Sequence, residues 1–464
     1  MVFSSITFIY NYLPLVLLFY LLVPYKYKNI ILLIFSLLFY FYKEYVYIWI
    51  LLLSIIVNFF TALYIEKNEK NKKRIFILSI IFNIGLLCYF KYTNFFIDNI
   101  NNILNINIEY LNIIMPIGIS FFTFQTLSYI IDVYNKKVKA DKNIINFACY
   151  VSLFPQLIAG PIVRYKDVND ELIKRKINFQ DFSQGVERFV IGLAKKVLIA
   201  NIIGEMIDIL GNLQNESILS FILIAIGFTL QIYFDFSGYS DMAIGLGKML
   251  GFHFLENFNY PFIAKSITDF WRRWHISLSS FFKDYVYIPL GGNKVGKIKH
   301  IRNIFIVWFL TGFWHGAAWN FIIWGVYFGI ILIIEKYFIK NFLEKHKIFS
   351  HLYTIILIII SFIIFNANNL TEVIIFFKNM FGFTNLPFTN FETNYYLKSY
   401  LVILIISIIA STPILKNIYL NIKEKTKYKK IISFLEIIVT FTLLIIITSF
   451  LIDASFNPFL YFRF

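Results

Sequence analysis

The chain has 464 residues, of which 59% are hydrophobic and only 15% are charged, and its mean hydropathy is +0.69. A soluble domain cannot bury so many apolar side chains in one core, so this composition excludes an ordinary soluble protein and indicates that lipid is the solvent. The formal net charge is +16, but the basic residues are spread over short loops and not gathered on one face, so no nucleic-acid partner is expected.

Long apolar runs recur from Phe8 to Phe450. A membrane-spanning helix needs about 20 mainly apolar residues, so the runs predict an all-α, polytopic integral membrane protein with about 11–12 transmembrane helices. The first run, Ile6 to Val23, has no preceding Lys or Arg and no small-residue cleavage site after it. We therefore expect it to remain as the first span and not to be removed as a signal peptide.

The basic loops alternate along the chain as the positive-inside rule requires. Loops such as Lys67 to Arg74 and Glu335 to Lys347 are rich in Lys and Arg, whereas the loop from Asp98 to Tyr110 has neither. This pattern predicts a multi-pass protein of the cell (cytoplasmic) membrane whose N- and C-termini both lie on the extracytoplasmic side.

One apolar segment, Ile144 to Val163, has basic stretches on both flanks. It contains Pro155, Gly160 and Pro161, which interrupt helices and free backbone groups. We expect this segment to be re-entrant, entering and leaving on one side.

The sequence offers little for metal, thiol or nucleotide chemistry. Cys88 and Cys149 lie in apolar stretches with no His or Cys at metal-ligand spacing, so they are interpreted as packing residues and no metal site is expected. No phosphate-binding glycine-lysine loop, dinucleotide fingerprint or serine nucleophile elbow is found.

Ionisable groups inside apolar spans are costly and therefore candidates for function. His315 lies in the run from Thr311 to Trp319 beside Trp314 and several small residues. A neutral imidazole can take a proton from a hydroxyl nucleophile, because its reference pKa is close to the working pH. The alternative is a structural histidine hydrogen-bonded between helices.

A second polar cluster begins at Asp269, and its members are Trp271, Arg272, Arg273, Trp274, His275 and Ser277. Arg272 and Arg273, with Lys283, are suited to holding phosphates. The equally weighted alternative is an interfacial helix whose Trp and Arg side chains anchor it among membrane lipid headgroups.

Asp235 and Asp241 form a third candidate site, with Ser237, Gly238 and Ser240 between them. Carboxylates inside a membrane protein often complete ion pairs. We favour that interpretation, with Arg272, Arg273 or another buried cation as the partner.

These motifs together resemble the membrane-bound O-acyltransferase family, and within it the branch of the alginate O-acetyltransferase membrane subunit. The resemblance is dense from Pro116 to Trp324 and looser toward the C-terminus. The runs that carry it, in chain order, are Met115–Gln125, Phe154–Arg164, Tyr233–Asp241, Trp271–Ser277, Ile288–Asn293, Trp314–Gly316 and Asn457–Phe459.

The resemblance implies one membrane-embedded domain over residues 1–464, with a catalytic core at 112–324 and a central tunnel. It implies that His315 is the catalytic base and that His275 orients or polarises the acyl donor. Substrate-binding roles are expected for Trp271, Arg272, Arg273, Trp274, Ser277, Trp314, Asp235 and Asp241.

The resemblance also implies substrates and partners. The expected donor is a cytoplasmic acyl-thioester, acetyl-CoA, with no bound cofactor. The expected acceptor is an extracytoplasmic envelope polysaccharide such as alginate or peptidoglycan, reached through a separate esterase-like acetyltransferase partner.

Two alternatives remain from the sequence. One is D-alanyl transfer to teichoic acid from an aminoacyl carrier protein. The other is a proton-coupled transporter that uses Asp235 and Asp241 as a relay, although the interrupted helix pair typical of many transporters is missing.

Overall fold

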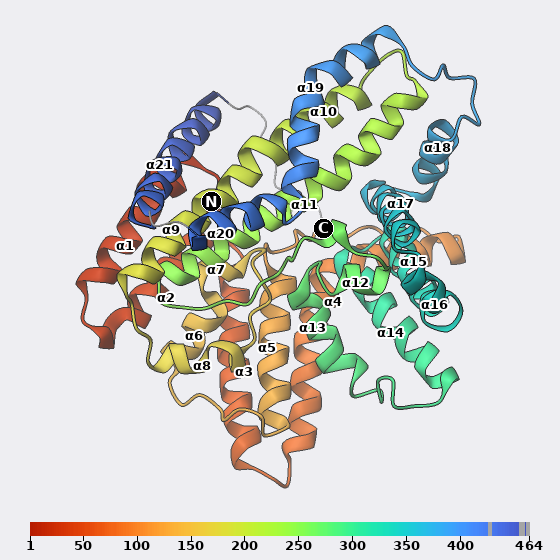
Figure 1. Ribbon diagram of the computed structural model, residues 1–464. Coiled ribbons are helices and arrows are strands. Elements are labelled where there is room, and N and C mark those ends of the chain that lie inside the picture. The colour runs from red at the N-terminus through yellow and green to blue at the C-terminus, as the bar shows by residue number, and fades with distance from the viewer. Residues whose placement is uncertain (426–428, 454–459, 461–464) are drawn as a thin grey trace. The chain divides into compact units, whose positions relative to one another are not determined.

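The computed structural model describes residues 1–425, 429–453 and 460, and within these residues every regular element is a helix (Figure 1). The predicted all-α class is confirmed. The motif at residues 457–459 and the chain end lie outside the described residues. The α-helices are α1 (Leu13–Leu22), α2 (Lys28–Glu44), α3 (Ile48–Lys67), α4 (Lys72–Leu104), α5 (Ile119–Tyr134), α6 (Ile144–Ser152), α7 (Phe154–Leu157), α8 (Tyr165–Ile173), α9 (Phe179–Ala194), α10 (Ile202–Gly211), α11 (Ile218–Met249), α12 (Ile267–Trp271), α13 (Ile276–Phe282), α14 (Lys297–His315), α15 (Trp319–Ile334), α16 (Lys340–Lys345), α17 (Lys347–Asn366), α18 (Leu370–Met380), α19 (Phe391–Ala410), α20 (Ile414–Lys425) and α21 (Lys429–Asp453).

Among the described residues, seven helical stretches are long and apolar enough to cross a membrane. They are Ile48–Lys67, Lys72–Leu104, Ile218–Met249, Trp319–Lys345, Lys347–Asn366, Phe391–Ala410 and Ile431–Asp453. Several other expected spans are built from shorter pieces. The run expected at 185–210, for example, consists of α9 and α10 joined by a π-helical segment, Lys195–Asn201.

The chain divides into two compact units, residues 1–189 with 240–255, and residues 190–239 with 256–464. Helix α11 contributes to both units, since it runs from Ile218 to Met249.

In the first unit, α3, α4 and α5 lie side by side (Figure 1). They are joined by a buried polar contact in which the Asn58 and Asn83 amides exchange hydrogen bonds of 3.0 and 2.8 Å. Thr126 on α5 donates a further hydrogen bond of 3.0 Å to Asn83. Between helices in an apolar surrounding, such satisfied polar pairs fix which faces meet.

The segment expected to break does so in the same unit. Helix α6 ends at Ser152, α7 begins at Phe154 with Pro155 in its first turn, and a turn followed by irregular chain then leads to Arg164. Proline is tolerated in a first helical turn but not in a helix interior, so Pro155 starts a new helix instead of continuing α6.

In the second unit, α14 and α15 form a closely packed pair joined by the short link 316–318. A Cβ on Gly312 would collide with the backbone of Phe321 and lie 3.1 Å from the Cα of Gly325. The two glycines therefore allow the helix backbones to touch, which fixes the end of α14 where His315 lies.

Candidate active site

His315 is the last residue of α14 and is buried in the second unit, with 6% of its surface exposed. Its ring contacts Trp314, Trp324 and Phe365, with centroid distances of 4.9, 5.1 and 5.3 Å. It lines a small cavity of about 20 Å³ together with Asp235 and Trp274. Such a space has room for about one water molecule. His315 therefore faces a small enclosed cavity.

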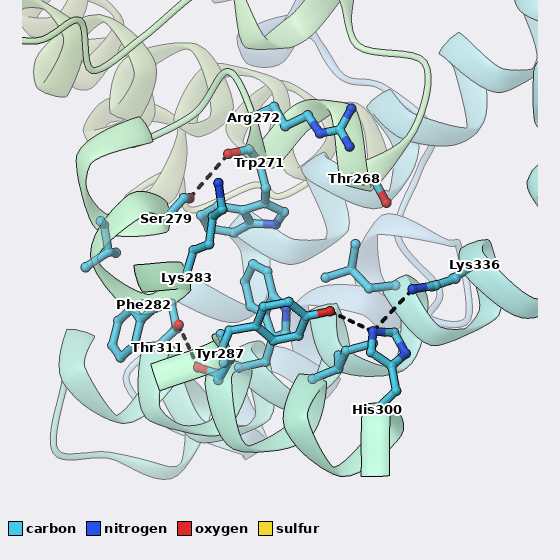
Figure 2. Close-up of a pocket in the computed structure, with 15 residues that line it drawn as sticks. Thr268, Trp271, Arg272, Ser279, Phe282, Lys283, Tyr287, His300, Thr311 and Lys336 are labelled. Atoms are coloured by element: carbon cyan, nitrogen blue, oxygen red, sulfur yellow. Dashed lines mark hydrogen bonds between the residues drawn. The ribbon is translucent and has the colours of Figure 1, made fainter. Parts of the chain in front are cut away.

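A much larger cavity, of about 380 Å³, lies in the same unit (Figure 2). Its volume falls in the range of small-molecule sites. Its basic lining residues are Arg272, Lys283, His300 and Lys336, and hydroxyl side chains make up the rest of its polar lining. Figure 2 shows Arg272 and Lys283 on one side of the cavity, and His300 with Lys336 on another. The remaining lining includes Trp271, Leu278, Phe282, Ile304, Val307, Trp308 and Leu332.

Trp271 and Trp324 connect the walls of the two cavities. Trp271 lines the larger cavity, Trp324 lines the one beside His315, and their rings meet edge to face at 5.7 Å. Both rings also pack against Phe328 at 5.1 Å. This unit therefore holds two separate cavities whose aromatic walls touch, and the expected tunnel stays a prediction.

His300, which sequence reasoning missed, joins the polar side of the larger cavity. Its Nε2 lies 2.8 Å from the hydroxyl of Tyr287, and its Nδ1 lies 2.7 Å from the hydroxyl of Tyr337. The Nζ of Lys336 is 3.3 Å from the same Nε2. Burial and the nearby Lys336 ammonium lower the pKa of His300, which favours the neutral ring.

His275 is fully enclosed, and its neighbours define its tautomer. Its Nδ1 lies 3.2 Å from the Oδ1 of Asn257, an atom that also accepts hydrogen bonds from the backbone N–H and the hydroxyl of Ser277. An amide oxygen only accepts, so Nδ1 of His275 donates and Nε2 is the unprotonated nitrogen. Burial lowers the pKa of His275 to about 3, which keeps this ring neutral. The unprotonated Nε2 has no hydrogen to donate to a carbonyl oxygen. The geometry therefore favours a role for His275 in orienting the acyl donor over one in polarising its carbonyl.

The two arginines of the Trp271–Ser277 run have different surroundings. Arg272 is exposed and lines the larger cavity. Arg273 instead donates from Nε to Asp269 at 2.9 Å and from Nη1 to the carbonyl oxygen of Asn259 at 3.3 Å. The structure therefore brings Arg272 and Lys283 to one cavity and holds Arg273 in an ion pair outside its lining.

Glu335 positions this run. Its buried carboxylate accepts the backbone N–H of Ile267 at 2.5 Å, and the backbone N–H and hydroxyl of Thr268 at 3.0 and 2.9 Å. These groups lie at the start of α12, where N–H groups lack helical partners. The contact fixes α12, and with it Trp271, to the end of α15.

Asp235 and Asp241 are each paired with a cation other than Arg272 or Arg273. Asp235 lies 2.6 Å from the Nζ of Lys196, inside the second unit. Asp241 lies 2.7 Å from the Nη2 of Arg188, inside the first. The expectation of structural ion pairs is consistent with this geometry, but the partners come from α9 and the π-helical segment after it.

The other expected residues surround His315 and His275. Trp274 stacks on Phe270 at 5.5 Å and lines the small cavity. Trp314 lies between the two imidazoles, 4.9 Å from the ring of His315 and 6.2 Å from that of His275. Ser277 bonds to Asn257 and so supports the histidine indirectly.

The chain is similar to a known family and to several named proteins. The model of the membrane-bound O-acyltransferase family matches residues 34–377. The probable alginate O-acetylase AlgI of Pseudomonas syringae pv. tomato is 41% identical over 391 residues, covering 82% of this chain and 76% of that protein. The peptidoglycan O-acetyltransferase of Helicobacter pylori is 38% identical, covering 72% of this chain and 70% of that protein. The teichoic acid D-alanyltransferase of Bacillus subtilis is 34% identical over a shorter region, 51% of this chain and 62% of that protein.

The apolar helices and the family match over residues 34–377 define an integral membrane acyltransferase. The chain belongs to the membrane-bound O-acyltransferase family. Its reaction moves an acyl group from a donor to an oxygen of the acceptor.

Proposed function

We propose that the chain passes an acetyl group from acetyl-CoA in the cytoplasm, across the cell membrane, for O-acetylation of an extracytoplasmic polysaccharide. The observation that supports this most is the pair of cavities in the second unit. A donor-sized cavity with cationic side chains lies one aromatic partition away from the enclosed His315.

The larger cavity is the proposed donor site. Arg272, Lys283 and Lys336 offer positive charge to the phosphates of the donor, and Trp308 and Leu332 offer apolar wall to its thioester arm. Helix α14 begins at Lys297 and α15 is followed by a basic stretch, so the positive-inside rule assigns this side to the cytoplasm. A cytoplasmic donor can therefore reach the cavity directly.

His315 is the proposed general base. Its ring is buried among aromatic side chains, where little water competes for the reacting groups. A neutral imidazole there takes the proton of an incoming hydroxyl as that oxygen attacks the thioester carbonyl, and it returns the proton to the departing thiolate. In this account His275, held by Asn257, orients the donor.

The acceptor is proposed to approach from the C-terminal end of α17. Phe362 and Phe365 of this helix line the His315 cavity, while Asn366 at its end lines a third cavity of about 420 Å³. The charged residues in that lining are Glu216 and Glu372, so its charge is opposite to that of the donor cavity. Carboxylate and amide groups suit an acceptor rich in hydroxyls and disfavour an anionic donor.

The acceptor class and partner rest on the relatives. One relative is named for alginate and another for peptidoglycan, so an envelope glycan is the proposed acceptor class. We propose further that a separate extracytoplasmic esterase-like protein completes the transfer onto the polymer. The single domain over 1–464 with its core at 112–324, and the extracytoplasmic termini, remain part of this proposal.

The test is chemical analysis of base-labile acetyl on each envelope polymer in cells with and without this gene. We expect one polymer to lose its acetyl in the deletion strain and to regain it with the wild-type gene but not with His315→Ala at equal abundance. An unchanged acetyl content in every polymer would contradict the proposal. Loss of base-labile D-alanine instead would identify the teichoic acid alternative.

A further inference from the structure

Trp324 carries a buried hydrogen-bond donor that the fold leaves unused. Its side chain is only 2% exposed, and its indole Nε1 has no acceptor among the described residues. Buried tryptophan N–H groups usually find an acceptor, and an exception in a folded protein needs an explanation. A phenylalanine would fill an aromatic wall without stranding a polar group.

The ring that carries this N–H lies beside the proposed reaction centre. Trp324 lines the same small cavity as His315, and the two rings meet edge to face at 5.1 Å. On its other side the Trp324 ring contacts Trp271, which lines the donor cavity. A donor thioester that extends from the larger cavity toward His315 must therefore pass the Trp324 ring.

The ring is also held in place before any substrate arrives. Besides His315 and Trp271, it packs against Phe328 and Phe365, each at 5.1 Å. Hydrogen-bond donors that are already fixed in a water-poor site stabilise developing charge without the cost of reorganisation.

Acyl transfer creates a charge that such a donor can stabilise. The acceptor oxygen loses its proton to His315 and bonds to the thioester carbon, and the carbonyl π electrons move onto oxygen as an oxyanion. When this intermediate collapses, the C–S bond breaks, the carbonyl reforms, and the thiolate takes the proton from His315. Esters and thiols result, and no further reactant is needed.

The imidazoles do not supply the donor for that oxyanion. His315 is occupied with the proton of the acceptor hydroxyl, and the neutral His275 uses its N–H toward Asn257. We propose that the indole N–H of Trp324 donates a hydrogen bond to the thioester carbonyl oxygen and stabilises its oxyanion. This assignment rests on the proposed function, because it makes Trp324 a catalytic residue of that same transfer.

The experiment measures kcat and the donor KM for acetyl transfer by purified protein with acetyl-CoA. Trp324→Phe removes the N–H and keeps an aromatic ring, so we expect kcat to fall about 100- to 1,000-fold with little change in donor KM. Trp319→Phe is the matched control, since Trp319 starts the same helix and is 53% exposed. It should keep wild-type kcat.

A second variant separates loss of the N–H from poor packing. Benzothienylalanine at position 324 keeps the shape of the indole and replaces its N–H by sulfur, so it should lose kcat as Trp324→Phe does while melting like the wild type. Full kcat in this variant overturns the assignment. His315→Ala is measured alongside: if it is inactive while the position-324 variants are fully active, only this inference fails, and if it is active, the proposed function fails too.

Discussion

The Nζ of Lys196 lies 2.6 Å from the Oδ1 of Asp235, and the two side chains are 4% and 2% exposed. The other oxygen of Asp235 accepts the backbone N–H of Leu460 at 2.9 Å. Asp235 and Leu460 both line the cavity beside His315, so this ion pair helps to hold the wall of that cavity in place. Both carboxylate oxygens of Asp235 are thus engaged by fixed partners, which is a poor arrangement for a proton relay.

Breaking this pair should unfold the second unit more easily. Lys196→Met leaves the Asp235 carboxylate buried without its cation, and removal of one partner from a buried pair costs about 3–5 kcal/mol. The melting temperature in detergent should fall accordingly. The double variant Lys196→Met with Asp235→Leu should recover much of the loss.

The control for that prediction is Lys340→Met. Lys340 pairs with Glu344 at 3.8 Å, and both side chains are 65% exposed. An exposed pair contributes at most about 1 kcal/mol, so little change in melting is expected. Equal losses in Lys196→Met and Lys340→Met would contradict the structural role of the buried pair.

Neutralising the donor cavity should weaken donor binding. Arg272→Gln and Lys283→Gln each remove one positive charge from the lining of the cavity. We expect the donor KM to rise about tenfold in each, which corresponds to about 1.4 kcal/mol of binding free energy. The effect should shrink at high ionic strength, because both cations are exposed.

Lys345→Gln, at an exposed position on α16, serves as the charge-matched control for the donor variants. It should leave the donor KM unchanged. If Arg272→Gln and Lys283→Gln lower only the amount of inserted protein and not donor affinity, then these residues anchor the chain at lipid headgroups.

His275 should make the protein acid-sensitive. Its native pKa of about 3 is below the reference value of 6.5, so below pH 6.5 the unfolded chain takes up a proton that the native chain does not. Stability is therefore lost as the pH falls, by roughly 2 kcal/mol between pH 6.5 and 5. His275→Gln should flatten the acid side of a plot of melting temperature against pH. An identical acid slope in the variant and the wild type would show that His275 is charged in the native protein.

Much of the fold follows from the sequence because lipid imposes simple patterns. Apolar runs predicted the helices, and Pro155 predicted the break between α6 and α7. The lengths were less predictable. A π-helical segment at Lys195–Asn201 joins two shorter helices where one span was expected.

The sequence predicted those parts of the candidate site in which an ionisable residue lies in or beside an apolar run. His315 and the Trp271–Ser277 run were found because ionisable and aromatic residues beside a bilayer are unusual. Trp324 has no such signal, since a tryptophan in an apolar helix is ordinary. Only the structure shows that its N–H is buried without an acceptor.

Long-range partners were missed for a related reason. Lys196 and Glu335 are ionisable residues next to apolar runs. The rule that ionisable residues in apolar spans are candidates for function would have identified both. Their partners, Asp235 and the start of α12, are distant in sequence. His300 was hidden because it lies within the basic run from Lys297 to Arg302.

The central claim is that His315 promotes transfer of the acetyl group, and a single-turnover assay tests it most directly. Purified wild-type protein and His315→Ala are each loaded with acetyl-CoA labelled in the acetyl group and given a hydroxyl acceptor. We predict that both bind the donor with similar affinity and that only the wild type forms labelled ester. Ester formation by His315→Ala at the wild-type rate would contradict the account.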